Sequence, residues 1–254
     1  MLIAQISDLH VTVPGQSPGA GVDSADNLAR AVTAINALDP QPDVVVASGD
    51  LVEWGTDAEY ERLRDLLRAL RAPYRLMAGN HDERAALLRT FPECAPIDAS
   101  LGIQQTIDAG SLRLMLLDSL VPGAALGTLG GERLAWLDAQ LTEARAVAAM
   151  VFVHHPPIET GVPQVDESRL TDADALAALV ERHRNVVRVA CGHLHREIFC
   201  TWAGTTLSVC PSTAHQFLFD LRSGGRLRAV AAAPAFQLHR WQHGSLQTFT
   251  LPLS

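Results

Sequence analysis

The chain has 254 residues, a length that fits one large domain or two small ones and supports a sizeable core without disulfides. Its 28 Asp and Glu residues outnumber its 20 Lys and Arg residues, and the formal net charge of −8 argues against a broad surface for nucleic acid or an anionic membrane. All 20 cationic side chains are arginine, so a P-loop lysine, a Schiff-base lysine and a lysine general base are excluded.

The sequence carries no signal for export or membrane insertion. No apolar run approaches the roughly 20 residues that span a bilayer, and the first residues contain neither a basic region nor a small-residue cleavage site. We therefore expect a cytoplasmic protein with no membrane partner. The cysteines form no C-x-x-C pair, and we expect core thiols at Cys94, Cys191, Cys200 and Cys210.

The first half of the chain alternates short Val- and Ile-rich runs with amphipathic helical patterns, which is typical of βαβ units. Strands are expected over 2–6, 43–47 and 74–78, and helices over 27–38, 58–71 and 82–89. A hairpin is expected over 103–108 and 112–117, with its turn around Gly110.

The second half begins with the same alternation and then changes character. A helix is expected over 131–145, a strand over 150–153, a helix over 172–184 and a strand over 186–190. From about residue 197 the helical period disappears, and an antiparallel β portion is expected with strands over 205–209, 227–230, 236–241 and 246–251. We expect one α/β domain over 1–254, with two sheets packed face to face and helices outside.

Short polar blocks follow five of the expected strands, at the point where each strand ends. Ligand sites in α/β sheets lie beyond the carboxyl ends of the strands. Six of the ten histidines fall in these blocks, with carboxylates and a carboxamide. The blocks are Asp8-Leu9-His10, Gly49-Asp50, Gly79-Asn80-His81-Asp82, His154-His155-Pro156-Pro157 and Gly192-His193-Leu194-His195. Each alone can be explained as a helix cap, a turn or a core imidazole, but their joint placement favours a metal site.

The number of candidate ligands predicts two metal ions, because it exceeds the three protein ligands that hold a catalytic zinc. The seven candidates are Asp8, His10, Asp50, Asn80, His154, His193 and His195. Nitrogen and oxygen donors of this kind suit Mn, Fe(II), Co or Zn. If Asp50 bridges, each ion receives four protein ligands. Two divalent ions, two carboxylates and one hydroxide sum to about +1, which suits a phosphodiester monoanion.

The ordered blocks resemble those of the calcineurin-like metallophosphoesterase superfamily, over residues 8–195. Within it the chain is similar to bacterial class III cyclic nucleotide phosphodiesterases and glycerophosphodiesterases, through residues 6–10, 48–52, 117–119 and 211–216. The resemblance implies a four-layer αββα sandwich of two mixed sheets flanked by helices. Purple acid phosphatases of this superfamily carry a tyrosine shortly after the Gly-Asp block, but Glu53 ends the segment here, so no tyrosinate-ferric site is expected.

The resemblance also implies a division of the site residues. One metal would take Asp8, His10, Asp50 and His195, and the other Asp50, Asn80, His154 and His193. His81 would face the phosphate, where it stabilises the transition state or protonates the leaving oxygen, unless it is a turn histidine bonded to a carboxylate such as Asp82. Asn80 and His215 would join it in substrate binding, unless His215 is only structural. We expect His155 to support the metal ligands rather than bind metal, because adjacent side chains diverge at a strand end.

These features predict a dinuclear metal-dependent phosphodiesterase that hydrolyses small diesters, such as cyclic nucleotides or glycerophosphodiesters, through a metal-bound hydroxide. The alternative is a phosphomonoesterase or nucleotide phosphatase of the same fold. Its nearest extra cations would be Arg84, expected to pair locally, and Arg196. A non-catalytic binding scaffold and a nuclease are more remote alternatives. We expect loops 11–26, 120–130 and 159–168 to wall the pocket, and homo-oligomerisation stays open.

Overall fold

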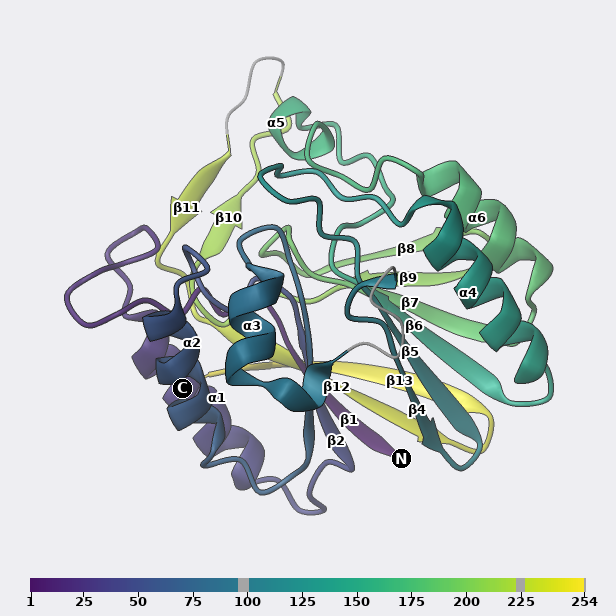
Figure 1. The fold of residues 1–254 in the computed structure, drawn as a ribbon, viewed down its shortest axis with the longest axis horizontal. Helices are drawn as coiled ribbons and strands as arrows, with labels where there is room; N and C mark the ends of the chain where they lie inside the picture. The colour runs from purple at the N-terminus through teal and green to yellow at the C-terminus, as the bar shows by residue number, and fades with distance from the viewer. Residues whose placement is uncertain (96–100, 223–226, 254) are drawn as a thin grey trace.

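The computed structural model describes residues 1–95, 101–222 and 227–253, and its framework is two large sheets packed face to face (Figure 1). The strands of the first sheet are β1 (Leu2–Ile6), β2 (Val44–Ser48), β3 (Tyr74–Met77), β12 (Ala235–Gln242) and β13 (Ser245–Pro252), in the order β13-β12-β1-β2-β3. The strands of the second are β4 (Gln105–Ala109), β5 (Leu112–Leu117), β6 (Ala148–Val153), β7 (Val186–Cys191), β8 (Ile198–Trp202) and β9 (Thr205–Val209), in the order β4-β5-β6-β7-β9-β8. A separate hairpin joins β10 (Gln216–Leu218) to β11 (Arg228–Val230).

Helices cover both outer faces of the two sheets, so the predicted four-layer αββα sandwich is confirmed (Figure 1). Over the first sheet lie α1 (Ser24–Asn36), α2 (Asp57–Leu67), α3 (Arg84–Thr90) and the short 3-10 helix η1 (Pro92–Cys94). Over the second lie α4 (Gly130–Glu143) and α6 (Ala173–Arg182). The one-turn helix α5 (Pro163–Asp166) stands near the hairpin β10–β11.

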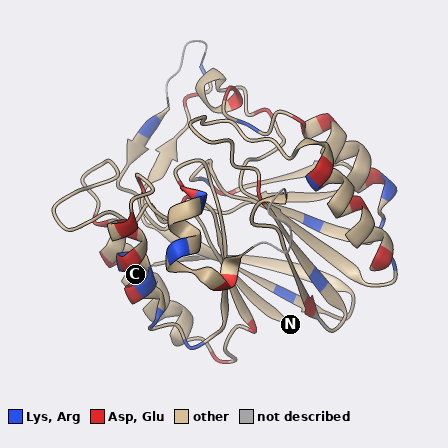
Figure 2. Cartoon of the chain, viewed as in Figure 1, with Lys and Arg blue, Asp and Glu red and all other residues tan. Residues whose placement is uncertain are grey.

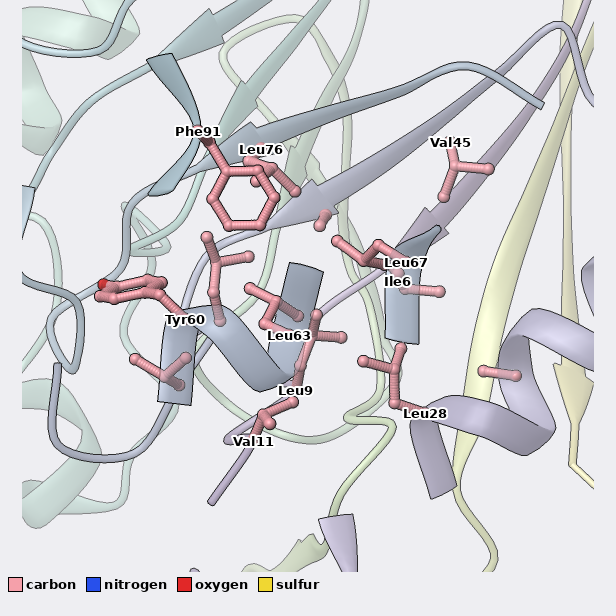
Figure 3. Close-up of a cluster of buried hydrophobic side chains, with 14 of the residues drawn as sticks. Ile6, Leu9, Val11, Leu28, Val45, Tyr60, Leu63, Leu67, Leu76 and Phe91 are labelled. Atoms are coloured by element: carbon pink, nitrogen blue, oxygen red, sulfur yellow. The ribbon is translucent and has the colours of Figure 1, made fainter. Parts of the chain in front are cut away.

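Three apolar layers hold the sandwich together. On the first outer face, Leu28 of α1 and Leu63 of α2 pack with buried strand residues such as Ile6 (Figure 3). Between the sheets, side chains such as Val46 and Phe152 share a second cluster, and α4 and α6 bury a third against the other outer face. Successive side chains of a strand point to opposite faces of the sheet, so odd- and even-numbered residues of one strand pack in two different apolar layers.

The parallel strands bring their carboxyl ends to one rim of the sandwich. In the first sheet β1, β2 and β3 are mutually parallel, and in the second β5, β6, β7 and β9 are. The expected C-terminal antiparallel portion therefore needs a correction at β9, which pairs parallel with β7, whereas β8, β10, β11, β12 and β13 pair antiparallel. The segment 192–204, with β8 in it, forms the crossover that returns the chain to the same end of the sheet.

The cysteines carry no disulfide in the structure. Cys94, Cys191 and Cys210 are buried thiols, as expected, and Cys200 is half-buried on the edge strand β8. None of the helices in the described part of the chain combines the length and apolarity needed to span a bilayer.

Candidate metal centre

All seven predicted ligands lie in loops at the rim where the parallel strands end. In the first sheet, Asp8 and His10 follow β1, Asp50 follows β2 and Asn80 follows β3. In the second, His154 follows β6, and the pair His193 and His195 follows β7. Backbone hydrogen bonds tie these loops together, since the His10 N–H donates to the Asp50 carbonyl and the Gly192 N–H to the His154 carbonyl. Both sheets therefore contribute to one site.

Four of the predicted ligands form a compact group of donor atoms. Asp8, His10, Asp50 and His195 each offer an atom within 4.8 Å of the others. The Nε2 atoms of His10 and His195 lie 3.1 Å apart, Asp8 Oδ1 lies 3.4 Å from His195 Nε2, and Asp50 Oδ2 lies 3.7 Å from His10 Nε2. This group is the same set that the resemblance implies for the first metal.

A second group adjoins the first through Asp50. His154 Nε2 lies 3.3 Å from Asp50 Oδ2, and the rings of His154, His155 and His193 offer nitrogens within 4.8 Å of one another. Among the described residues, His154 Nε2 and Asn80 Oδ1 are buried with no hydrogen-bond partner. Leaving a buried acceptor unpaired costs about 1–3 kcal/mol, so two such atoms at one place fit a bound cation. The residues present therefore fit a dinuclear metal centre.

The imidazoles of three predicted ligands are oriented by hydrogen bonds on their far side. The Nδ1–H of His10 donates to Glu53 Oε2 at 2.6 Å, that of His154 to the Ser48 carbonyl at 2.9 Å, and that of His195 to the His215 carbonyl at 2.9 Å. A neutral imidazole that donates through Nδ1 has its lone pair on Nε2, which is the usual arrangement of a metal-bound histidine. Sequence reasoning missed Glu53 in this role, although it follows Asp50 by only three residues.

Glu53→Gln is expected to weaken metal binding about 10- to 100-fold, because the amide replaces a charged acceptor that raises the basicity of His10. The apparent Mn affinity from activity and from direct titration should fall together. Glu159→Gln is a matched control, since Glu159 is an exposed carboxylate that pairs with Arg169. Wild-type Mn affinity in Glu53→Gln would contradict the orienting role.

The backbone at the ligands adopts a conformation that most residues avoid. Among the described residues, eight non-glycine residues have positive φ, and five of them are Asp8, His10, Asp50, His193 and His195, with φ between 44° and 70°. Such residues carry a backbone cost that surrounding structure must offset, and they cluster at functional sites. Five of the seven predicted ligands therefore occupy positions whose backbone conformation the surrounding structure must hold.

Glycine 79 lets the two groups approach each other. A Cβ at Gly79 would overlap Asp50 Oδ1 and the Asp50 N–H, and would lie 2.7 Å from His154 Nε2. The glycine of the Gly-Asn-His-Asp block is thus required for close approach rather than for a turn. The loop is then fixed by Asp82, whose carboxylate accepts from the N–H groups of Gly79 and Leu51 and from the Tyr60 hydroxyl.

The electrostatics of the centre favour positive charge between the carboxylates. Burial alone would raise the pKa of Asp8, but His195 and His154 lower it to about 2. Burial would also raise the pKa of Asp50, but His154 is the main cause that lowers this pKa well below its usual value. Burial would lower the pKa of His154, but Asp50 and Asp8 raise it to about 9. Both carboxylates are therefore ionised at neutral pH, and the positive charge that they attract is either the proton on His154 Nε2 or, once that proton leaves, a metal cation.

The structure places the predicted non-ligand residues around the same site. His81 is about one-third exposed, and its Nδ1–H donates to the Glu53 carbonyl at 2.9 Å rather than to Asp82. Burial lowers its pKa, but Asp50 and the Glu53 carbonyl outweigh that effect and the net shift is upward.

His215 lies against His195, with ring centroids 4.5 Å apart. His155 Nδ1 lies 2.8 Å from Ser119 Oγ, and its ring stays beside His193 rather than diverging from the site.

Arg84 does not pair locally as expected. Its guanidinium makes two hydrogen bonds of 2.6 and 2.7 Å to the fully buried carboxylate of Asp118, at the end of β5, and a third to the Leu120 carbonyl. The competing local carboxylates are already used, since Asp82 binds the Gly79 loop and Glu83 caps α3. Arg196 lines a different cavity, beside Glu197.

A cavity of about 350 Å³ opens over the two groups. Each of the three expected loops contributes to its wall, through Pro18, Ala125 and the segment with Gln164, Val165 and Ser168. The hairpin β10–β11, which was not expected there, adds Phe217 and Ala229. The Leu227 N–H donates to Gln164 Oε1 at 2.9 Å, so the hairpin and α5 are joined above the site. No arginine lines this cavity within the described residues.

Comparison with known families agrees with this geometry. The model of the calcineurin-like phosphoesterases matches residues 1–197. The chain belongs to the calcineurin-like phosphoesterase family. This calcineurin-like phosphoesterase is 32% identical over 242 residues to a probable glycerophosphodiester phosphodiesterase GpdQ of Arcobacter nitrofigilis, over 95% of the chain and 89% of the relative. It is 32% identical to the 3′,5′-cyclic adenosine monophosphate phosphodiesterase CpdA of Pseudomonas aeruginosa, over 85% and 78%.

The fold of this phosphoesterase is also found among solved structures. A dimetal phosphatase from Danio rerio superposes with a TM-score of 0.76 at 16% identity, over 100% of this chain and 99% of the other. The purple acid phosphatase PPD1 of yellow lupin superposes with a TM-score of 0.71 at 13% identity, over 99% and 51%. At these identities the similarity shows the fold alone, and the fold agrees with the four layers described above.

Proposed function

We propose that this calcineurin-like phosphoesterase is a dinuclear metal-dependent phosphodiesterase that hydrolyses small diesters such as cyclic nucleotides or glycerophosphodiesters. The observation that carries the proposal is Asp50, which lies within reach of both ligand groups, beside the unpaired Nε2 of His154. We propose that Asp8, His10, Asp50 and His195 hold one ion, and Asp50, Asn80, His154 and His193 the other. The activities named for the relatives above support the diesterase class.

Each protein group has a defined part in the proposed reaction. When bound, Mn, Fe(II), Co or Zn ions would supply Lewis acidity toward the phosphoryl oxygens and lower the pKa of a water. Asp8 and Asp50 would reduce the charge of +4 that two divalent ions bring to about +2 before substrate enters. The Nδ1–H of His81 is held by the Glu53 carbonyl, so its Nε2 carries a proton only in the imidazolium form, which can stabilise the phosphate or protonate the leaving oxygen. Asn80 and His215 would contact the substrate.

The cavity favours a diester over a monoester because none of the described residues supplies an arginine to its lining. A dianionic monoester needs extra positive charge, but no arginine lines the cavity in the described part of the chain. Turning Arg84 toward the site would break its pair with buried Asp118, and removing one partner of a buried pair costs about 3–5 kcal/mol. This argument ranks the phosphomonoesterase second.

We expect bis(p-nitrophenyl) phosphate to be cleaved with a kcat/KM at least about tenfold above that of p-nitrophenyl phosphate, equivalent to about 1.4 kcal/mol of transition-state binding. Both substrates should be measured at pH 7 to 8 with saturating Mn, and activity should disappear with a chelator and return with Mn, Co or Zn. Comparable or reversed rates with both metal positions filled would instead favour the phosphatase. If the protein binds both metal ions but hydrolyses neither substrate, the result would favour the alternative of a non-catalytic binding scaffold.

The remaining expectations concern the domain organisation, the partners and the cellular location of the protein. We propose that residues 1–254 act as one domain, since both sheets supply predicted ligands; Ser254 lies outside the described residues. Figure 2 shows arginine segments interspersed with acidic ones on the outer helices, an arrangement that does not favour binding of a nucleic acid polymer. The cytoplasmic location and homo-oligomerisation stay predictions.

A further inference from the structure

Trp54 stands out among the exposed apolar side chains of the described residues. Single exposed apolar residues are normal and need no explanation. Trp54, however, is 53% exposed and directly follows Glu53, whose side chain orients His10 and whose carbonyl orients His81. No aromatic ring or guanidinium of the described residues stacks on the Trp54 indole. A large aromatic surface is thus presented to solvent at the edge of the metal centre.

A second cavity, lined in part by Trp54, adjoins the cavity over the metal ligands. It has a volume of about 310 Å³ and is lined by Glu53, Trp54, Asn80, His81 and the turn 123–125. Glu53, Asn80, His81 and Ala125 also line the cavity over the metal ligands, so the two spaces share a wall. A substrate whose phosphate lies at His81 can therefore extend one of its substituents into the second cavity.

The turn that carries Trp54 is held rigidly. The Trp54 N–H donates to Glu59 Oε2 at 3.2 Å, and the same oxygen accepts from the Thr56 N–H, in the capping box of α2. At Gly55, where φ is +70°, a Cβ would lie 2.9 Å from the Cβ of Glu83. A rigid aromatic side chain loses little conformational entropy when a ligand stacks on it, which favours a binding role.

We propose that Trp54 is a stacking platform for the base of a nucleotide diester, in a subsite between its indole and the turn 123–125. The inference rests on the proposed diesterase function and selects one of its substrate classes. The charged groups in the lining are Glu53 and His81, and the Glu53 carboxylate is bound to His10. A planar aromatic substituent gains from the indole face, whereas a glycerol headgroup gains little there.

The test compares an aromatic with a non-aromatic diester in the Mn-loaded enzyme. The readout is the ratio of kcat/KM for 3′,5′-cyclic AMP to kcat/KM for glycerophosphoethanolamine. Trp54→Ala should lower this ratio roughly 5- to 100-fold, as expected for loss of one base–aromatic stack. Trp54→Phe retains a ring and should restore most of the ratio. Phe249→Ala is a matched control, because Phe249 is a similarly exposed aromatic on β13, outside both cavity walls.

A binding measurement separates this inference from the proposed function. Adenosine carries the base but no phosphate, and its affinity for the Mn-loaded protein can be measured by calorimetry whether or not any diester is hydrolysed. Weaker adenosine binding to Trp54→Ala, with recovery in Trp54→Phe, is the expected result. An unchanged substrate ratio together with unchanged adenosine affinity in Trp54→Ala overturns the subsite. Failure to hydrolyse any diester overturns the proposed function, while the adenosine titration still decides the role of Trp54.

Discussion

Asp50→Asn is expected to abolish binding of both metal ions at micromolar supply and to lower kcat/KM by about 10³-fold or more. Asp50 belongs to the first group of donor atoms and lies 3.3 Å from His154 of the second, and each tenfold loss of rate corresponds to only about 1.4 kcal/mol of lost stabilisation. Asparagine is the informative replacement because it removes the charge but keeps a side-chain oxygen. That oxygen can still accept a hydrogen bond from the backbone N–H of His81, which lies 2.9 Å from Asp50 Oδ1 in the wild-type chain. Asparagine also tolerates the positive φ of 49° at this position.

For this variant, we would measure the metal content per chain. We would also measure the melting temperature of the protein after a chelator has removed the metal. Asp65→Asn serves as the charge control, since Asp65 is a well-exposed carboxylate on α2 that pairs with Arg68. If Asp50→Asn keeps one ion at full occupancy, Asp50 does not bridge the two groups. If the wild-type protein itself never binds more than one transition metal per active chain, the two-ion model is wrong.

His81→Ala should have the opposite signature, with both metals retained and kcat lowered about 10²- to 10⁴-fold, the range typical of one acid-base group. His81 lines the cavity but belongs to neither predicted ligand set. Its two candidate roles differ in how the loss depends on the leaving group. A proton donor matters most for an alkoxide leaving group, so cyclic AMP should suffer more than bis(p-nitrophenyl) phosphate, whereas simple stabilisation of the phosphate affects both equally.

The control for His81→Ala is His243→Ala, which removes an exposed imidazole from the turn between β12 and β13. Metal analysis of both variants should match the wild type. Loss of metal from His81→Ala as complete as that from Asp50→Asn would show that the division between ligands and catalyst is wrong.

Hydrophobic periodicity predicted most helices and strands, and tertiary contacts explain where it failed. The helix expected over 58–71 ends at Leu67, because Asn36 of the neighbouring helix binds the Ala69 carbonyl and the Arg71 N–H. Four short elements were not expected: β8, β10, α5 and η1. β10 is a three-residue strand and α5 a four-residue helix, lengths over which neither period can be recognised.

The site shows the same division between local and long-range information. The ligand blocks are local, since each follows its own strand and the parallel topology brings them together. The pair between Arg84 and Asp118 was not predicted, because it joins residues 34 positions apart on different layers. The hairpin that closes the cavity was missed as a wall for the same reason, since β10 and β11 follow the last ligand block and their placement depends on the whole sandwich.

The left-handed backbone at Asp8, His10, Asp50, His193 and His195 restricts the sequence changes that this rim can accept. Glycine adopts that conformation most readily, and the other residues most often found in it are asparagine, aspartate and histidine. The side chains of asparagine, aspartate and histidine all carry oxygen or nitrogen donors that bind transition metals. A substitution that removes metal binding, such as alanine or valine, therefore also adds backbone strain. Loss of the metal centre by gradual change would reduce the stability of the fold as well as its activity, so the conformation of the chain and the chemistry of the site select the same side chains.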